Sequence, residues 1–397
     1  MTGALRDGLF LATASLRHAW MRSTLLAVVL GVSLGIPAAL AALLEHASSS
    51  MRARTAVAPI VVGARGSESD LVFGALFFAA RPPRGLAMGD LARVEREALA
   101  TAVPLALGPT AAGHAVVGTT LDYFDRRALS PRSGAMFATI GECVVGASVA
   151  RARTLTPGSR FFTDPSSLSD LAGVFPLELV VAGVLPATNS PDDDAIFVDL
   201  RTLWTIQGLG HGHEEPAQSQ AAGAVIGQDG DRTIAGEALP IERRAAEGVS
   251  ESFHFHGSPE AFPISAALVY PRDAKAQAIV LGRFTSEKEP LQAVRPEQFA
   301  DRVLDRIFGV GRVLGAIALG TAALVALVAA TTFALSIRLR ADELRLMRRL
   351  GASRARVAVF LAVEACVLLA VAAVIAAALA VTAPAAAPAI LRVASGA

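Results

Sequence analysis

The sequence predicts a membrane protein with three transmembrane α-helices and a large extracytoplasmic α+β domain. Two observations lead to this fold class. Apolar residues are concentrated in three stretches long enough to cross a bilayer, and the region between the first two stretches mixes strand-like and helix-like patterns. The composition agrees, because only 18% of the 397 residues are charged and 53% are hydrophobic. These figures also exclude a disordered chain.

The three apolar stretches are almost free of charge. Thr24–Leu44 and Val313–Ile337 contain no charged residue, and Phe360–Pro384 contains only Glu364. A helix of about 20 such residues spans the hydrocarbon core of a bilayer. We therefore place the transmembrane helices at residues 23–44, 313–337 and 358–383.

A cleaved signal peptide is the alternative for the first stretch. The apolar core of a signal peptide is usually about 7–15 residues long, shorter than this stretch. Residues 1–22, which precede it, also have the apolar spacing of an amphipathic helix. An uncleaved anchor preceded by a cytoplasmic amphipathic helix is therefore the better interpretation.

The flanking charges predict the orientation. Residues 1–22 carry a net charge of +2 and residues 338–357 one of +5, whereas residues 45–307 carry −7. Basic segments stay on the cytoplasmic side, so the N-terminus and the connector at 338–357 are predicted to be cytoplasmic. The large domain and the tail, residues 384–397, then lie outside. The net charge of the whole chain is only +1, which argues against nucleic-acid binding.

Residues 45–295 form the predicted extracytoplasmic domain. Residues 207–259 are rich in Gly, Ala, Glu and His without a sustained period, which predicts a flexible insertion. Elsewhere β-branched runs predict strands, and apolar residues three to four positions apart predict helices. The predicted strands are 57–64, 115–119, 143–146, 177–185, 195–198 and 266–270, and the predicted helices are 70–79 and 88–98.

A long helix is predicted to connect the domain with the second span. Apolar residues recur at spacings of four and three residues from Pro296 onward, and this stripe runs directly into the apolar stretch. Residues 296–312 therefore form a predicted stalk helix. Its stripe consists of Phe299, Val303, Ile307 and Val310.

The cytoplasmic connector contains the most specific pattern in the chain. It predicts a short amphipathic helix at the membrane surface, with arginines on its other faces. Gly351 predicts where this helix ends, and Ser353 is a natural cap for the next helix. An anchor for anionic lipids is the alternative interpretation. One side of the predicted helix is formed by Leu339, Glu343, Leu346, Met347 and Leu350.

These residues carry a family resemblance. The run Glu343-Leu-Arg-Leu-Met-Arg-Arg-Leu-Gly-Ala-Ser353, followed by an apolar helix with Glu364, resembles the FtsX-like permeases of ABC transporters, which include the MacB and LolC/LolE types. Segments of the outer domain resemble the MacB-like periplasmic core domain. They are Pro59–Ser67, Val117–Thr120, Gly146–Ala150 and Val181–Leu185.

The resemblance implies a permease of the bacterial inner membrane that forms a homodimer or heterodimer. A separate ATPase would supply ATP and magnesium and would dock on the cytoplasmic helix. The outer domains and the stalk would move with ATP binding. The contact with the ATPase would be made by Glu343, Leu344, Leu346, Met347, Leu350 and Gly351, and the stalk stripe would transmit the movement.

The chain departs from the family pattern at its C-terminal end. The family usually has a fourth span that returns the chain to the cytoplasm. Residues 382–397 are too few and too rich in proline to form one, so a three-span variant and a truncated chain both remain open.

The sequence contains no nucleotide-binding loop of its own. A Walker loop needs a lysine after a glycine, whereas Lys275 follows an alanine and Lys288 a glutamate. No catalytic residue and no directly bound nucleotide are therefore expected in this chain. Two small-residue pairs, Gly31 with Gly35 and Gly311 with Gly315, instead predict close helix packing within the fold or across a dimer.

Two further features carry candidate chemistry. His211, His213, His254 and His256 lie in the insertion, and imidazole suits zinc. Their spacing matches no closed structural zinc site, so a solvated loop and a zinc-binding loop both stay open. Glu364 is an ionisable group inside the predicted third span, which makes it a functional candidate. The alternative is a packing residue that is hydrogen-bonded to Thr331 or Thr332.

The leading hypothesis is a permease subunit that couples ATP hydrolysis by a separate ATPase to movement of the extracytoplasmic domain. Its client would be a lipoprotein, a lipid, a peptide or a metal-linked molecule. The second hypothesis is a membrane-anchored binding or zinc-sensing module without transport activity. A membrane-tethered enzyme is disfavoured, because no recognisable set of nucleophile and base is present.

Overall fold

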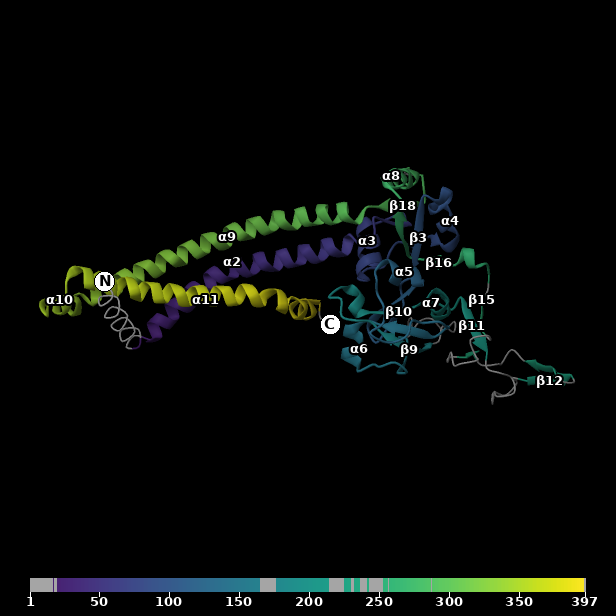
Figure 1. The fold of residues 1–397 in the computed structure, drawn as a ribbon, viewed down its shortest axis with the longest axis horizontal. Coiled ribbons are helices and arrows are strands. Elements are labelled where there is room, and N and C mark those ends of the chain that lie inside the picture. Colours follow the sequence, from purple (N-terminus) through teal and green to yellow (C-terminus); the bar gives the residue numbers. More distant parts are fainter. Residues whose placement is uncertain are drawn as a thin grey trace. The chain divides into compact units, whose positions relative to one another are not determined.

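The computed structural model describes residues 17, 20–164, 176–213, 225–229, 232–235, 241–242, 253–255, 257–286 and 288–395. The predicted amphipathic helix at residues 1–22 lies almost entirely outside the described residues. The chain divides into two compact units (Figure 1). The helical unit runs to Met51 and resumes at Arg302, and the mixed unit is Arg52–Asp301.

The first main sheet of the mixed unit is antiparallel, with the strand order β18-β1-β17-β3. All five residues of β1 are buried, as expected for a strand covered on both faces. One covering element is α3 (Glu68–Phe77), which Ser67 caps by accepting a hydrogen bond from the Asp70 amide. The strands are β1 (Ile60–Ala64), β3 (Ala100–Leu105), β17 (Ala266–Pro271) and β18 (Leu291–Val294).

The second main sheet has seven strands in the order β4-β5-β10-β7-β9-β6, with β8 also paired to β9. The pairs β5–β10 and β7–β9 are parallel and the other pairs are antiparallel. The mixture of sheets and helices confirms the predicted α+β class of this domain. The strands are β4 (Thr110–Ala111), β5 (His114–Thr119), β6 (Ser133–Gly134), β7 (Glu142–Val145), β8 (Arg160–Phe162), β9 (Glu178–Val184) and β10 (Ala195–Asp199).

The two main sheets are joined in one hydrophobic core. Ala106, just after β3, exchanges two backbone hydrogen bonds of 2.9 Å with Gly118 of β5. A single cluster of buried apolar side chains contains residues of both sheets, such as Val62 and Val198. The helices that cover or connect the strands are α5 (Leu121–Arg126), α6 (Ala147–Arg153), α7 (Leu200–Ile206), α8 (Ala274–Arg283) and the 3₁₀ turn η3 (Pro191–Asp194).

Two predicted segments differ from the structure. The helix predicted at 88–98 is broken into η1 (Met88–Asp90), α4 (Leu91–Val94) and η2 (Arg96–Ala98), because Glu97 and Ala98 have positive φ angles of 64° and 51°. Residues 207–259, predicted as a flexible loop, contain strands, because backbone pairing does not require a hydrophobic period. These are β11 (Gly210–His213), β12 (Val225–Asp229), β13 (Arg232–Ala235), β14 (Ile241–Glu242) and β15 (His254–Phe255).

A short sheet and a 3₁₀ turn complete the mixed unit. β2 (Leu86–Ala87) pairs antiparallel with β16 (Pro263–Ile264). The turn η5 (Pro259–Ala261) leads into β16. The Met88 amide donates a 2.9 Å hydrogen bond to the backbone oxygen of Phe262, which continues the pairing beyond β2.

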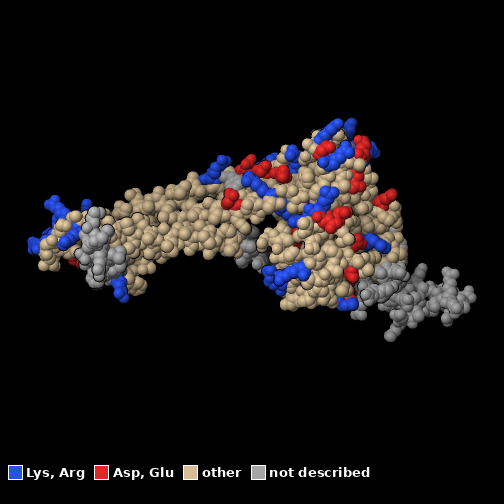
Figure 2. All heavy atoms as spheres, viewed as in Figure 1, with Lys and Arg blue, Asp and Glu red and all other residues tan. Residues whose placement is uncertain are grey.

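The helical unit is built from α2 (Trp20–Thr55), α9 (Pro296–Leu339), α10 (Ala341–Arg349) and α11 (Arg354–Ser395). Stalk and second span form one continuous helix, α9. Three helices, Ser23–Thr55, Pro296–Leu339 and Arg354–Ala385, are long and apolar enough to cross a membrane by length and composition. Only 17%, 6% and 22% of their most apolar windows are buried among the described residues, so most of this apolar surface is exposed. The middle of this unit shows few charged groups in Figure 2, whereas basic side chains, all of them arginines, gather at its α10 end.

The last helix is longer than the span predicted for it. We place the end of the third span at residue 383, but α11 continues through Pro384 and Pro388 to Ser395. A proline removes one backbone donor and disturbs the preceding turn, and the helix continues here despite that loss. The predicted tail is therefore helical over its described residues.

Candidate functional site

The candidate site is α10 and the residues that hold it. Ala341, Leu344 and Met347 are half-buried and lie three residues apart along α10, which is in contact with α11. Leu346 and Leu350 are 57% and 81% exposed. Leu350 follows Met347 by three residues, so the two lie on one side of the helix, but Met347 is the more buried of the two.

The end of α10 follows the prediction. Gly351 has a φ of 98°, the left-handed conformation that glycine adopts at little cost. The Gly351 amide donates to the Arg348 oxygen at 3.1 Å and the Ala352 amide to the Met347 oxygen at 3.0 Å, the two bonds of a Schellman motif. The Ser353 hydroxyl accepts a 3.3 Å hydrogen bond from the Arg356 amide. The expected helix stop and the expected cap are both confirmed.

Five of the six residues predicted to contact an ATPase thus fall into two groups. Glu343, Leu346 and Leu350 are exposed at the helical spacing of three and four residues, whereas Leu344 and Met347 are half-buried. Gly351 ends the helix. The exposed group lies among arginines, and an exposed apolar stripe of this kind suits a partner surface. Their role in binding stays a prediction.

Glu364 of α11 is buried and paired. Its Oε1 lies 3.5 Å from Nη1 of Arg340, and the two side chains are 3% and 19% exposed. The alternative interpretation is wrong about the partner, because the hydroxyls of Thr331 and Thr332 each donate to the Val328 oxygen of their own helix at 2.8 Å. Arg340 lies in the turn between α9 and α10. The ion pair therefore ties that turn to α11.

The glycine pairs differ in what surrounds them. A Cβ on Gly31 would lie 2.7 Å from Cβ of Ile375, and one on Gly35 would lie 2.6 Å from Cδ1 of Leu379, so α2 and α11 pack closely here. A Cβ on Gly311 would lie 2.8 Å from Leu44, whereas nothing lies within 4 Å at Gly315. Close packing within the fold therefore applies to three of the four glycines. Gly315 faces open space among the described residues.

The stalk stripe is only partly described. Phe299 is 4% exposed and meets the ring of Phe73 edge-to-face at 5.6 Å. Val303 is half-buried, whereas its neighbour Leu304, which the pattern misses, is 4% exposed. The side chains of Ile307 and Val310 lie outside the described residues. The part of the stripe in transmission stays a prediction.

Strand pairing brings two of the four histidines together. In the antiparallel pair β11–β15, His211 lies directly opposite His254. His213 pairs with Ile241 of β14 on the other side of β11. His256 and the side chains of His211 and His213 lie outside the described residues. Among the residues that are described, no group of three or more His, Cys, Asp or Glu is placed to hold a metal ion.

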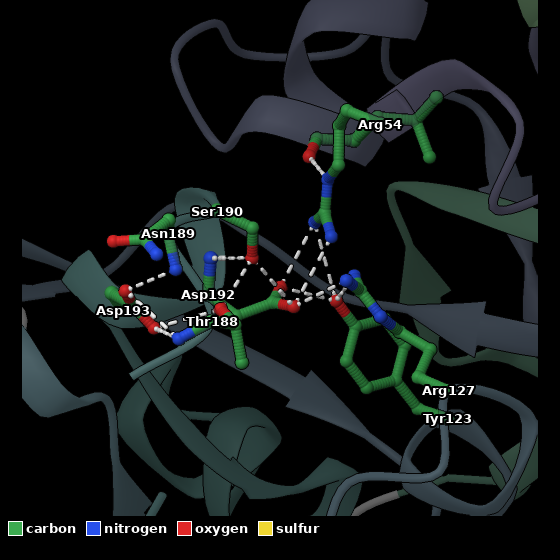
Figure 3. Close-up of polar contacts among 9 residues, drawn as sticks. Arg54, Tyr123, Arg127, Thr188, Asn189, Ser190, Asp192 and Asp193 are labelled. Carbon is green, nitrogen blue, oxygen red and sulfur yellow. Dashed lines mark hydrogen bonds and ion pairs between the residues drawn. The ribbon is translucent and has the colours of Figure 1, made fainter. Parts of the chain in front are cut away.

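The mixed unit also contains a buried polar cluster that the sequence pattern misses (Figure 3). We call Arg54, Tyr123, Arg127 and Asp192 the Arg54 cluster. Arg54 grips the Asp192 carboxylate with both terminal nitrogens, Nη2 to Oδ1 at 2.9 Å and Nη1 to Oδ2 at 3.2 Å. Arg127 adds a contact from Nη2 to Oδ2 at 2.7 Å. A bidentate arginine–carboxylate contact is among the strongest and most directional polar contacts in proteins.

Both carboxylate oxygens of Asp192 and the hydroxyl oxygen of Tyr123 accept hydrogen bonds in this cluster. The Tyr123 hydroxyl donates to Oδ1 of Asp192 at 2.7 Å, and the Ser190 hydroxyl donates to Oδ2 at 3.2 Å. The same tyrosine oxygen accepts from Arg127 at 3.0 Å and from Arg54 at 3.3 Å. Burial raises the pKa of Tyr123 well above its ordinary value, and the Asp192 carboxylate adds to this rise while the positive charge of Arg54 offsets part of it. The hydroxyl therefore remains a donor at neutral pH.

The sequence contains only one local signal for a member of this cluster. Ser190 before Pro191 and three aspartates is a helix-start signature, and η3 begins there. No local pattern relates Asp192 to Arg54, which precedes it by 138 positions. Gly146 belongs to a motif that carries the family resemblance, and here it has a packing reason. A Cβ on it would lie 2.2 Å from the Asp192 backbone oxygen.

Comparison with known proteins supplies the family. The family model "MacB-like periplasmic core domain" matches residues 23–238. The periplasmic region of MacB from Actinobacillus actinomycetemcomitans is similar at 11% identity and a TM-score of 0.35, covering 62% of this chain and 94% of that one. The extracellular domain of the noncanonic ABC-type transporter YknZ from Gram-positive bacteria is similar at 12% identity and a TM-score of 0.32, covering 59% and 98%.

None of the curated proteins compared with this sequence matches it significantly. The family model alone covers more than half of the chain. The family consists of membrane-embedded permease components of ABC transporters, which have an extracytoplasmic domain and work with an ATPase partner. The chain therefore belongs to the MacB/FtsX-like family of ABC transporter permeases, through its MacB-like periplasmic core domain.

Proposed function

We propose that this chain is the permease subunit of an ABC transporter in a bacterial inner membrane, with its N-terminus and α10 in the cytoplasm. Two permease subunits would work with a separate ATPase, whose ATP hydrolysis moves the extracytoplasmic domain against a client. The client would be a lipoprotein, a lipid, a peptide or a metal-linked molecule. No nucleotide chemistry is assigned to the chain itself.

One observation carries this proposal beyond family membership. Leu346 and Leu350 stand exposed on a helix that is otherwise rich in arginine, between two helices apolar enough to be spans. An anchor for anionic lipids would need the same arginines, but it would use its apolar residues against the bilayer. Here Leu344 and Met347 are half-buried, whereas the two leucines are left uncovered by the described residues. The exposed leucines are therefore free for a protein partner.

Association with an ATPase tests the proposal. The full chain, in detergent, would be co-expressed with a candidate ABC ATPase subunit and recovered through a tag on the chain. Leu346→Asp should weaken recovery about tenfold or more, which corresponds to roughly 1.4 kcal/mol. Arg348→Gln is the matched control, because it changes the charge by the same amount on another face of α10. Recovery that is unaffected by Leu346→Asp and Leu350→Asp contradicts the docking assignment.

A failure to recover the ATPase with the unaltered chain would contradict the permease proposal itself. Recovery that falls equally for Leu346→Asp and Arg348→Gln would favour the lipid-anchor interpretation, since anionic lipids respond to charge and not to one leucine. Vesicles with and without anionic lipid separate these two cases directly.

A zinc-binding function is the second candidate, and the register of β11 and β15 favours it. His211 and His254 lie opposite each other in the strand pair, and two histidines could supply two of the ligands of a zinc site. Zinc titration of the full chain in detergent should show a binding step that the double variant His211→Ala, His254→Ala removes. His114→Ala, at a histidine of β5, serves as control. Binding that survives the double variant contradicts the site.

A further inference from the structure

Four segments that are distant in the sequence meet at Arg54 (Figure 3). Arg54 lies in the last turn of α2, and its Nε donates to the backbone oxygen of Leu76 in α3. Tyr123 and Arg127 belong to α5 and its C-terminal end, and Asp192 belongs to η3. α3 follows β1 of the four-stranded sheet, whereas α5 follows β5 and η3 precedes β10 of the seven-stranded sheet. The Arg54 cluster thus joins the end of α2 to elements of both sheets.

The contacts of Arg54 point in different directions. Nε reaches α3, and the two terminal nitrogens reach the two carboxylate oxygens of Asp192. The guanidinium carbon also lies 5.4 Å from the centre of the Phe78 ring. Because the Arg54 guanidinium is planar and makes contacts through all three nitrogens, it cannot rotate without losing more than one of these hydrogen bonds. The contacts therefore define the orientation of the last turn of α2.

A second arginine of the same turn behaves differently. Nε of Arg52 lies 3.6 Å from Oδ1 of Asp301, and both side chains are mostly exposed. Exposed pairs of this kind readjust in water and contribute little. In contrast, the side chains of Arg54 and Asp192 are 3% and 0% exposed. Only the inner arginine holds the helix in one position.

Burial of these charges needs a reason other than stability. A buried ion pair is often no more stabilising than apolar side chains of the same size, while loss of one partner is strongly unfavourable. Two arginines, a tyrosine and a serine converge on one carboxylate here. Such a set supplies fixed geometry, which an apolar contact does not.

We propose that Arg54 and Asp192 form a joint that holds the last turn of α2 rigidly against both sheets, so that the mixed unit turns as one body when α2 moves. Both are positioning residues. The joint itself does not depend on the proposed function, but its use in transmitting ATP-driven movement does. α2 is continuous from Trp20 to Thr55, so movement of its apolar part reaches Arg54 along one helix.

Distances between spin labels test the joint on the full chain in lipid nanodiscs, without an ATPase. One label replaces Ala53 (Ala53→Cys) on the exposed side of α2, and the other replaces Arg151 (Arg151→Cys) of α6 or Lys275 (Lys275→Cys) of α8. Cys366, which is exposed, is changed to serine, whereas Cys143 is buried. The pair with Arg151 reports the distance from α2 to the side of the seven-stranded sheet. The pair with Lys275 reports the distance from α2 to the side of the four-stranded sheet. Thermal melting shows that each variant is folded at the temperature of measurement.

The unaltered chain and Arg52→Gln should each give one narrow distance for both pairs. Arg54→Lys, which keeps the charge but not the fork, and Asp192→Asn should lose that single narrow distance in both pairs. Arg127→Gln is the decisive control. It removes a contact of 2.7 Å from the same carboxylate but lies outside α2. It should lower the melting temperature and leave both distances narrow.

Three outcomes would overturn the proposal. Narrow distances in folded Arg54→Lys and Asp192→Asn would mean that the cluster adds stability only. Broadening in Arg127→Gln equal to that in Arg54→Lys would mean a general loosening. Broadening in one label pair alone would mean that α2 is joined to one sheet and not to both. A chain that binds no ATPase would contradict the proposed function. The distance measurements would still test the joint, because they need no ATPase.

Discussion

Arg340 and Glu364 form an ion pair of 3.5 Å that links the turn before α10 to α11. Glu364 is nearly fully buried, and Arg340 lies in the turn between α9 and α10. A helix of nine residues has too few internal hydrogen bonds to keep its own orientation. The ion pair and the half-buried residues Leu344 and Met347 together hold α10 in place.

Glu364→Gln should therefore loosen α10. Removal of the negative charge abolishes the ion pair with Arg340 in a largely buried position, which should cost about 1–3 kcal/mol. Hydrogen exchange of the α10 amides in nanodiscs should become faster. Asp342→Asn is the matched control, because it neutralises a carboxylate that pairs with Arg345 at an exposed position. Equal exchange rates in both variants would contradict the role of Glu364.

The glycines on α2 should be sensitive to an added methyl group. Gly35→Ala places a Cβ 2.6 Å from Cδ1 of Leu379 and 3.1 Å from the backbone of Ala376, which should destabilise the chain by about 1–3 kcal/mol. Gly315→Ala meets open space inside α9 and should be neutral or stabilise by about 1 kcal/mol. Thermal unfolding in detergent measures both. A loss of stability at Gly315 as large as that at Gly35 would point to packing in a dimer.

Gly146 should be equally intolerant in the mixed unit. A Cβ there would lie 2.2 Å and 2.4 Å from the backbone oxygens of Asp192 and Asp193, and these atoms are fixed by η3. Gly146→Ala should cost about 1–3 kcal/mol and displace η3. Gly282 lies inside α8 with nothing within 4 Å, so Gly282→Ala should be neutral or stabilise by about 1 kcal/mol. The difference in melting temperature between the two variants checks this prediction.

The two tyrosines should respond differently to replacement by phenylalanine at neutral pH. Tyr123→Phe removes a buried donor to Asp192 and should cost about 1–3 kcal/mol. The Tyr270 hydroxyl is buried without a hydrogen-bond partner among the described residues, so Tyr270→Phe should cost nothing or stabilise. Chemical or thermal unfolding at pH 7 makes the comparison. A larger loss in Tyr270→Phe would contradict the assigned contacts.

The raised pKa of Tyr123 also predicts a dependence on alkaline pH. Below the ordinary pKa of 10.0 the hydroxyl is protonated in both states. Above it the unfolded chain releases the proton while the folded chain keeps it, so the folded state binds more protons and stability falls as pH rises. Tyr123→Phe should reduce this fall in the melting temperature above about pH 10. An unchanged pH profile would contradict it.

Much of the fold was predictable because it depends on local patterns. The three long helices follow from apolar length, and the strands β5, β7, β9 and β10 lie within a residue of their predicted bounds. Gly351 and Ser353 act on their immediate neighbours, so their roles are readable from the sequence. Glu97 and Ala98 are the counter-example. Their positive φ angles break a helix whose apolar spacing is regular, and no residue type there signals it.

The candidate site was only half predictable for the same reason. Residue type and spacing locate α10, but they do not say which of its residues are covered, so the half-burial of Leu344 and Met347 is not predictable from them. The partner of Glu364 depends on where the turn at Arg340 is placed, and the choice of Thr331 or Thr332 was wrong. The facing pair His211 and His254 depends on strand register.

Apolar length, charge balance and capping residues suffice to locate the three long apolar helices, the predicted orientation and the end of α10, because each acts through local composition or through neighbours in the chain. The joint at Arg54 and Asp192, the pair at Arg340 and Glu364 and the close approach at Gly146 come from the tertiary structure alone. Each needs two segments to meet in one orientation, and that meeting is decided by how sheets and helices pack into a shared core.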